Sequence, residues 1–138
     1  MIAKILWLMG SSIFLVLGSI HLYYTFFTSK FKARNKDVVT GMKSTSPVLT
    51  ADTTMWNAWI GFNASHSAGA IFIALINIIL ALQYFPVLQN SIFIPLLDVI
   101  TTGFYLWLAK KYWFSIPFTG ILISTCCFVI ATILIFFR

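Results

Sequence analysis

Four long runs of apolar residues alternate with short polar segments along the chain. The runs cover about residues 5–27, 55–82, 91–109 and 113–137. Roughly 20 helical residues, each rising 1.5 Å, cross a bilayer core of about 30 Å, so each run is about long enough to span a membrane. Because short connections favour antiparallel neighbours, the pattern predicts an all-α membrane protein with four transmembrane helices in an up-down-up-down bundle. Residues 1–138 then form a single transmembrane domain, with a basic loop at 28–54.

The first run begins after Lys4 and superficially resembles a signal peptide. It continues to about Phe27 without an Ala-x-Ala-like cleavage site, so we expect a retained helix. The composition agrees with a lipid environment, since 60% of the residues are hydrophobic and 9% are charged. Soluble domains have about 45–50% apolar and about 25% charged residues.

The net charge of +6 has to be interpreted by location. Seven of the nine basic residues lie in two loops, beside the ends of apolar runs, where they orient a membrane protein and attract anionic lipid headgroups. This distribution favours membrane lipids, not nucleic acid, as partners. By the positive-inside rule, both termini lie outside the cytoplasm. The residues expected to contact headgroups are Lys30, Lys32, Arg34 and Lys36.

Three ionisable residues fall inside the apolar runs, namely His21, His66 and Asp98. Such residues are costly in a bilayer unless they are paired or hydrated, and they commonly mark functional sites. His66 and Asp98 each lie about eleven residues, roughly 16 Å, from the basic face. An ion pair or hydrogen bond between them would hold both in a low dielectric.

His21 lies about one helical turn closer to the basic face, roughly 9 Å deep. Asn63 shares the helix face of His66 because it precedes it by three residues, and it lies about one turn closer to the basic face, level with His21. The sequence thus predicts a polar pocket that opens toward the basic face. The alternative is that these side chains only bind the helices to one another, as buried polar residues in membranes often do. The predicted pocket residues are His21, Asn63, His66, Asp98 and Thr102.

Small residues recur every four positions in the second run, at Gly61, Ser65 and Gly69. This spacing lets two helix backbones approach closely, so the stripe predicts helix packing. The only cysteines, Cys126 and Cys127, are adjacent, so a disulfide between them would be strained. They lack partners for a metal site, and no metal site is predicted.

Three stretches of the sequence, 21–27, 53–69 and 111–117, together resemble a family of small uncharacterised bacterial integral membrane proteins with four helices. The resemblance covers most of the chain, and its most distinctive element is the segment from Asn63 to Ser67. It implies four transmembrane helices and a location in the bacterial inner membrane. It implies no reaction or ligand.

Three functions are compatible with these features. The first is a binding or accessory protein, which holds a lipid-like molecule or docks on a larger membrane complex or a second copy of itself. The second is an intramembrane lipid-modifying enzyme that uses His66 and Asp98 as an acid–base pair, with His21 as a second proton carrier. The third is a b-type haem protein with His21 and His66 as axial ligands. The sequence lacks a nucleotide motif and a soluble domain, which favours the first.

Overall fold

The structure is a computed structural model, and it describes residues 1–137. Within that range the chain is helical, with no β-strand. The helices are α1 (Ile2–Phe27), α2 (Lys36–Ser44), α3 (Met55–Gln83), α4 (Phe85–Asn90), α5 (Phe93–Tyr112) and α6 (Ser115–Phe136). The all-α fold predicted from the hydropathy pattern is confirmed.

Four of these helices, α1, α3, α5 and α6, are long and apolar enough to cross a membrane. Their outer surfaces carry large apolar side chains, such as Phe62, Phe72 and Phe93, each more than half exposed. The buried positions include many small or polar residues, such as Ala74 and Ser67. Large apolar groups outside and small groups inside suit a protein whose solvent is lipid. The chain is an integral membrane protein by these criteria.

Two short helices lie in segments that the sequence analysis treated as loop. The first is α2, inside the predicted basic loop 28–54, where the side chain of Asn35 caps the helix by accepting the N–H of Asp37 at 2.9 Å. The second is α4, between the second and third spans, where Pro86 stands in the first turn. Proline is tolerated there because its missing N–H would have no intrahelical partner.

The chain divides into two compact units. Unit 1 comprises Met1–Leu17 and Ala70–Arg138, and unit 2 comprises Gly18–Gly69. The division falls within α1 and α3, so each of these helices contributes residues to both units.

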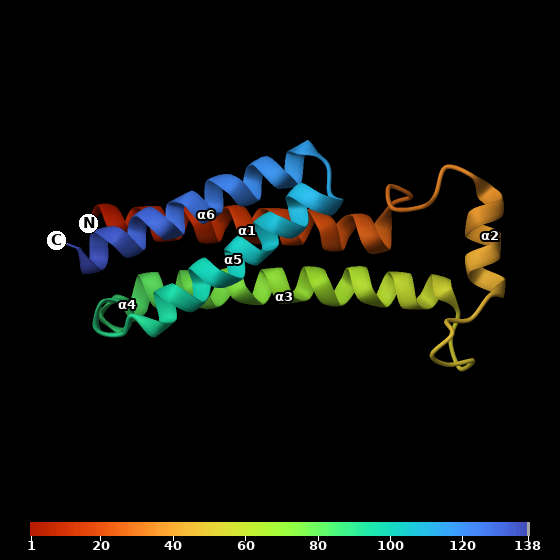
Figure 1. The fold of residues 1–138 in the computed structure, drawn as a ribbon, viewed down its shortest axis with the longest axis horizontal. Coiled ribbons are helices and arrows are strands. Elements are labelled where there is room, and N and C mark those ends of the chain that lie inside the picture. The colour runs from red at the N-terminus through yellow and green to blue at the C-terminus, as the bar shows by residue number, and fades with distance from the viewer. Residues whose placement is uncertain (138) are drawn as a thin grey trace. The chain divides into compact units, whose positions relative to one another are not determined.

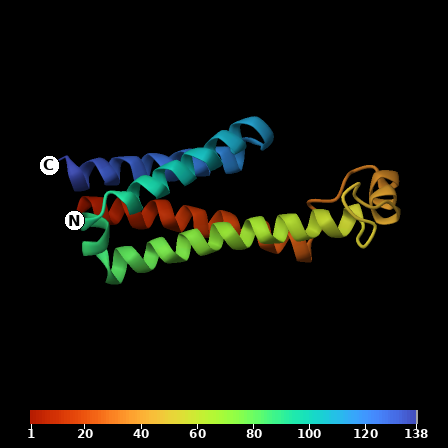
Figure 2. The same ribbon diagram turned by 60° about the horizontal axis from the view of Figure 1, so that its bottom comes forward.

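In unit 1, the first part of α1 and the whole of α6 pack antiparallel (Figures 1 and 2). Ser124 donates its hydroxyl to the carbonyl of Gly10 at 2.7 Å. One turn away, the rings of Trp7 and Phe128 meet edge to face, with centroids 5.0 Å apart. A Cβ at Gly10 would lie 3.1 Å from the Phe128 ring and from the Ser124 carbonyl oxygen. The contact therefore depends on a residue without a side chain.

Helices α5 and α6 lie side by side in unit 1 and run in opposite directions (Figures 1 and 2). The Thr125 hydroxyl bonds the carbonyl of Ile121, one turn earlier, and also reaches the Thr102 carbonyl on α5 at 3.3 Å. Bonds to a carbonyl one turn back also occupy the hydroxyls of Ser11 and Thr102. Hydroxyls satisfied in this way carry little cost in an apolar interior.

In unit 2, the chain leaves α1, passes through α2 and returns in α3. Helix α2 lies across the direction of the two longer helices (Figures 1 and 2). The backbone N–H of Met55 donates to the carbonyl of Thr45 at 2.8 Å, which ties the start of α3 to the end of α2. Helix α2 and the loops on either side of it thus connect the end of α1 to the start of α3.

Candidate functional site

The predicted pocket residues are divided between the two units: three lie in unit 2 and two in unit 1. In unit 2, His21 on α1 meets Asn63 on α3, with His21 Nε2 3.0 Å from Asn63 Oδ1. The carboxamide N–H of Asn63 already donates to the Trp59 carbonyl at 2.8 Å, which fixes its orientation. Because the amide oxygen can only accept, Nε2 of His21 carries the hydrogen of this bond.

His66 completes the group in unit 2. Its ring lies edge to face with the ring of His21, with centroids 5.5 Å apart. The ring of Phe62 stacks with that of His66, with centroids 6.4 Å apart and planes within 10°. The structure thus brings three of the five predicted pocket residues together: His21, Asn63 and His66.

This geometry does not fit a b-type haem held by the two histidines. Axial ligands stand on opposite faces of the haem plane with the iron between their nitrogens. Here the two imidazoles contact each other directly, and Nε2 of His21 is held by Asn63. Within residues 1–137, no group of three or more His, Cys, Asp or Glu side chains could hold a metal ion.

The other two predicted pocket residues, Asp98 and Thr102, belong to unit 1. Oδ1 of Asp98 accepts a hydrogen bond from Nδ2 of Asn77 at 2.8 Å. Asn77 in turn accepts the indole N–H of Trp7 through its own Oδ1, at 2.9 Å. The Thr102 hydroxyl donates to the Asp98 carbonyl at 2.8 Å and is fully buried. The bond predicted between Asp98 and His66 would join the two units and stays a prediction.

Sequence reasoning did not identify Asn77 as the partner of Asp98. The predicted depth put Asp98 level with His66, about eleven residues into the second span. Asn77 instead lies about 22 residues into α3. Because α3 has 29 residues and α5 has 20, their ends cannot both be level. A signal was present, since Asn77 is a strongly polar side chain in an apolar stretch of the second span.

The third polar feature is a pocket of about 520 Å³ in unit 2, directly after the end of α1. Three of the four residues predicted to contact headgroups line it, namely Lys32, Arg34 and Lys36. The fourth, Lys30, instead lies over the ring of Tyr24, with Nζ 5.2 Å from the centroid. The remaining lining residues are Ser29, Ala33, Val39 and Thr40.

A loop side chain connects this pocket with the histidines. Phe31 precedes the pocket residue Lys32, and its ring lies 4.5 Å from that of His21, centroid to centroid. It also meets the Tyr24 ring at 6.2 Å. Phe31 therefore holds the start of the basic loop against the end of α1.

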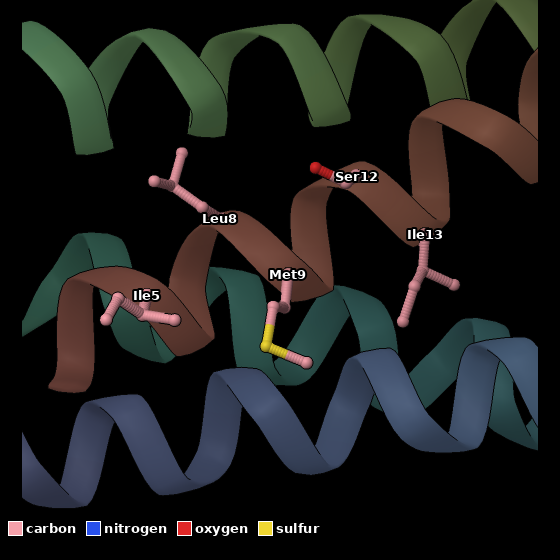
Figure 3. A pocket seen from close by; sticks show the side chains of 5 residues that line it. All are labelled: Ile5, Leu8, Met9, Ser12 and Ile13. Atoms are coloured by element: carbon pink, nitrogen blue, oxygen red, sulfur yellow. The ribbon is translucent and has the colours of Figure 1, made fainter.

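Two further hollows lie in unit 1. One, of about 410 Å³, is lined by successive turns of α1 and holds no ionisable side chain; its residues are Ile5, Leu8, Met9, Ser12 and Ile13 (Figure 3). The other, of about 320 Å³, lies where α5 gives way to α6 and contains one cation, Lys110. Neither gathers as many charged side chains as the pocket of unit 2.

The small-residue stripe of α3 makes no close contact among the described residues. A Cβ at Gly61 or Gly69 would meet nothing within 4 Å, and Ser65 is exposed. The helix packing predicted at Gly61, Ser65 and Gly69 stays a prediction. Close approach occurs instead at Gly10 and Gly120, which belong to α1 and α6.

No protein-family model, curated protein or solved structure matches this chain. The resemblance to small bacterial membrane proteins is thus supported only by the four membrane-length helices. The function has to be argued from the geometry alone.

Proposed function

We propose that this protein binds an anionic lipid, with the headgroup in the pocket formed by Lys32, Arg34 and Lys36. The observation that carries the proposal is the convergence of these three cations on one pocket of about 520 Å³. The pocket begins two residues beyond the last residue of α1, Phe27. Since α1 is long and apolar enough to span a membrane, its end belongs at the depth of the headgroups.

Aromatic side chains near the end of α1 and the start of α3 support this depth. Lys30 lies over Tyr24, and Nζ of Lys43 lies 5.6 Å from the centroid of a Trp56 ring. Tyrosine and tryptophan concentrate at membrane interfaces, where one part of the ring system is apolar and the other is hydrated. A lysine above such a ring reaches the headgroup layer while its stem stays in contact with apolar surface.

The charge of the pocket selects an anion. None of the three acidic residues of the chain, Asp37, Asp52 and Asp98, is among the described residues that line it. Each basic residue near an anionic surface contributes on the order of 1 kcal/mol of attraction. Three such side chains around one headgroup therefore hold an anionic lipid more firmly than dispersed lysines would.

The test compares two double variants that remove the same charge from the same loop. Lys32→Gln with Arg34→Gln removes two pocket cations, whereas Lys30→Gln with Lys43→Gln removes two cations outside the pocket lining. Binding of phosphatidylglycerol is measured by native mass spectrometry and by titration into protein in phosphatidylcholine nanodiscs. We expect the pocket variant to lose about thirtyfold in affinity, which corresponds to about 2 kcal/mol, and the control to change less than about threefold. Equal losses in both variants would refute a localised site.

The same proposal extends to the location of the protein. The sequence resemblance suggests a bacterial inner membrane, and the positive-inside rule places the basic loop in the cytoplasm. The cytoplasmic leaflet is rich in anionic lipids. A pocket for an anionic headgroup would face its ligand in that orientation.

A further inference from the structure

Three of the seven residues that line the pocket of unit 2 carry a positive charge. Lys32, Arg34 and Lys36 can donate but cannot accept. Thr40 already donates its hydroxyl to the Lys36 carbonyl at 3.1 Å, and Ser29 contributes a second hydroxyl. No carboxylate or carboxamide side chain is among the described lining residues. The pocket therefore suits a ligand that is rich in acceptors and poor in donors.

This lining discriminates among membrane headgroups. The ammonium groups of phosphatidylethanolamine and phosphatidylserine need acceptors, as do the hydroxyls of glycerol or sugar headgroups. A donor group that enters a pocket lined mainly by cations loses its bonds to water and finds few acceptors in return, and each donor left without a partner costs about 1–3 kcal/mol when it is buried. A bare phosphate carries only acceptors in its dianionic form.

The number of cations distinguishes between two kinds of phosphate. A phosphodiester carries one negative charge and two terminal oxygens. A phosphomonoester at neutral pH carries a charge of about −1.5 to −2 and three terminal oxygens. The planar fork of Arg34 can hold two of these oxygens at once, which leaves Lys32 and Lys36 for the third.

We infer that the pocket binds a lipid whose headgroup ends in a phosphate monoester or diphosphate, in preference to a phosphodiester. The inference rests on the proposed function, because it names the headgroup that this site selects. Its geometric basis is the convergence of three cations on one pocket, with no carboxylate or carboxamide side chain among the described lining residues, just beyond the end of α1.

The test compares phosphatidate with phosphatidylglycerol, each titrated into the protein in phosphatidylcholine nanodiscs. Measurements at about pH 7.5 and about pH 5 lie on either side of the second phosphate ionisation, at about pH 6. We expect phosphatidate to bind on the order of tenfold more tightly at the higher pH, because it carries nearly one more charge beside three cations. At the lower pH the preference should fall to about twofold or less, because the monoester then carries a single charge.

Phosphatidylglycerol serves as the internal control, since its charge is the same at both pH values. Its binding reports any change in the protein itself. The double variant Lys32→Gln with Arg34→Gln should lose the preference together with the binding. Soluble glycerol 3-phosphate should compete poorly, because it has no acyl chains.

The outcomes separate the two claims. Equal affinity for the two lipids at the higher pH overturns the monoester inference and leaves the proposed lipid site intact. No binding of either lipid overturns both. Competition by glycerol 3-phosphate at the concentrations at which phosphatidate binds would overturn the assignment to a lipid and would make the ligand a soluble phosphomonoester.

Discussion

The indole N–H of Trp7 donates to the amide oxygen of Asn77 at 2.9 Å, across 70 positions of sequence. The side-chain NH2 group of Asn77 makes two further hydrogen bonds. It donates to Asp98 at 2.8 Å and to the Ile73 carbonyl at 3.0 Å. One carboxamide therefore joins α1, α3 and α5 within unit 1. Trp7 is fully buried and Asn77 is 3% exposed, so the bond between these two side chains is buried.

Replacing Asn77 should destabilise the fold more than its size suggests. Asn77→Leu has a similar volume but leaves the Trp7 N–H and one Asp98 oxygen without their partner. We expect a loss of about 1–3 kcal/mol in the free energy of unfolding, measured by reversible unfolding in mixed detergent micelles. Asn90→Leu, at an exposed position of unit 1, is the control and should cost less than about 0.5 kcal/mol. Equal costs would show that the carboxamide bonds contribute nothing.

Asp98→Asn separates a structural role from a chemical one. The substituted amide oxygen can still accept from Asn77, so we expect a stable fold, within about 1 kcal/mol of the original by thermal unfolding in detergent. An acid–base role, predicted for Asp98 from the sequence, requires the carboxyl group itself. A folded Asp98→Asn protein that complements a null strain fully would exclude that role.

Close packing of α1 on α6 predicts a contrast between two glycines. At Gly10 an added Cβ would lie 3.1 Å from a backbone oxygen and from an aromatic ring, neither of which can move freely. Gly10→Ala should therefore lower the free energy of unfolding by about 1–3 kcal/mol. Gly61→Ala, where a Cβ meets open space, should be neutral or slightly stabilising. Thermal unfolding of the two variants in the same detergent decides the matter, and a reversed order would contradict the structure.

Phe31 should act as a positioning residue for the headgroup pocket. Its ring rests on those of His21 and Tyr24, which orders the loop that carries Lys32. Phe31→Ala should weaken binding of phosphatidylglycerol by about threefold to tenfold, as expected for the loss of an aromatic contact of about 0.5–1.5 kcal/mol. Phe27→Ala removes an equally large ring that is 74% exposed, and it should leave lipid affinity unchanged. Unfolding temperatures of both variants show whether the effect is local.

The predicted orientation can be tested without purified protein. Alkaline phosphatase fused to the C-terminus should be active, because the enzyme folds only outside the cytoplasm, and green fluorescent protein at the same position should be dark. Replacing the five cations of the loop between α1 and α3 with glutamine should weaken or invert this pattern. Fluorescence of the unmodified fusion would place the basic loop outside the cytoplasm. It would contradict the proposal that the pocket faces the anionic cytoplasmic leaflet.

The long helices could be predicted because each carries a continuous signal. Spans of about 55–82 and 113–137 were expected, and the helices run from Met55 to Gln83 and from Ser115 to Phe136. Hydropathy reports length and composition, and both are local properties. Helix α2 was missed because its nine residues contain no long apolar run, and its start depends on a single side-chain cap at Asn35.

The register between helices could not be read in the same way. Asp98 was assigned a depth by counting from the end of its own span, yet its partner Asn77 depends on how far α3 extends relative to α5. The offset between α3 and α5 depends on how their side chains pack together, so it cannot be obtained from the sequence of one helix alone. His21 and Asn63 were placed at similar depths because both were counted from the same basic loop, and the structure joins them by a hydrogen bond.

The bond between Ser124 and Gly10 spans 114 positions. During synthesis, α1 is made before α6. The face of α1 that carries Gly10 is therefore in contact with lipid, or with another protein, until α6 has been inserted. Assembly of unit 1 can finish only when the fourth span has been inserted, because contacts distant in sequence form last. A chain that stops before α6 would therefore leave this face of α1 without the helix that packs on it.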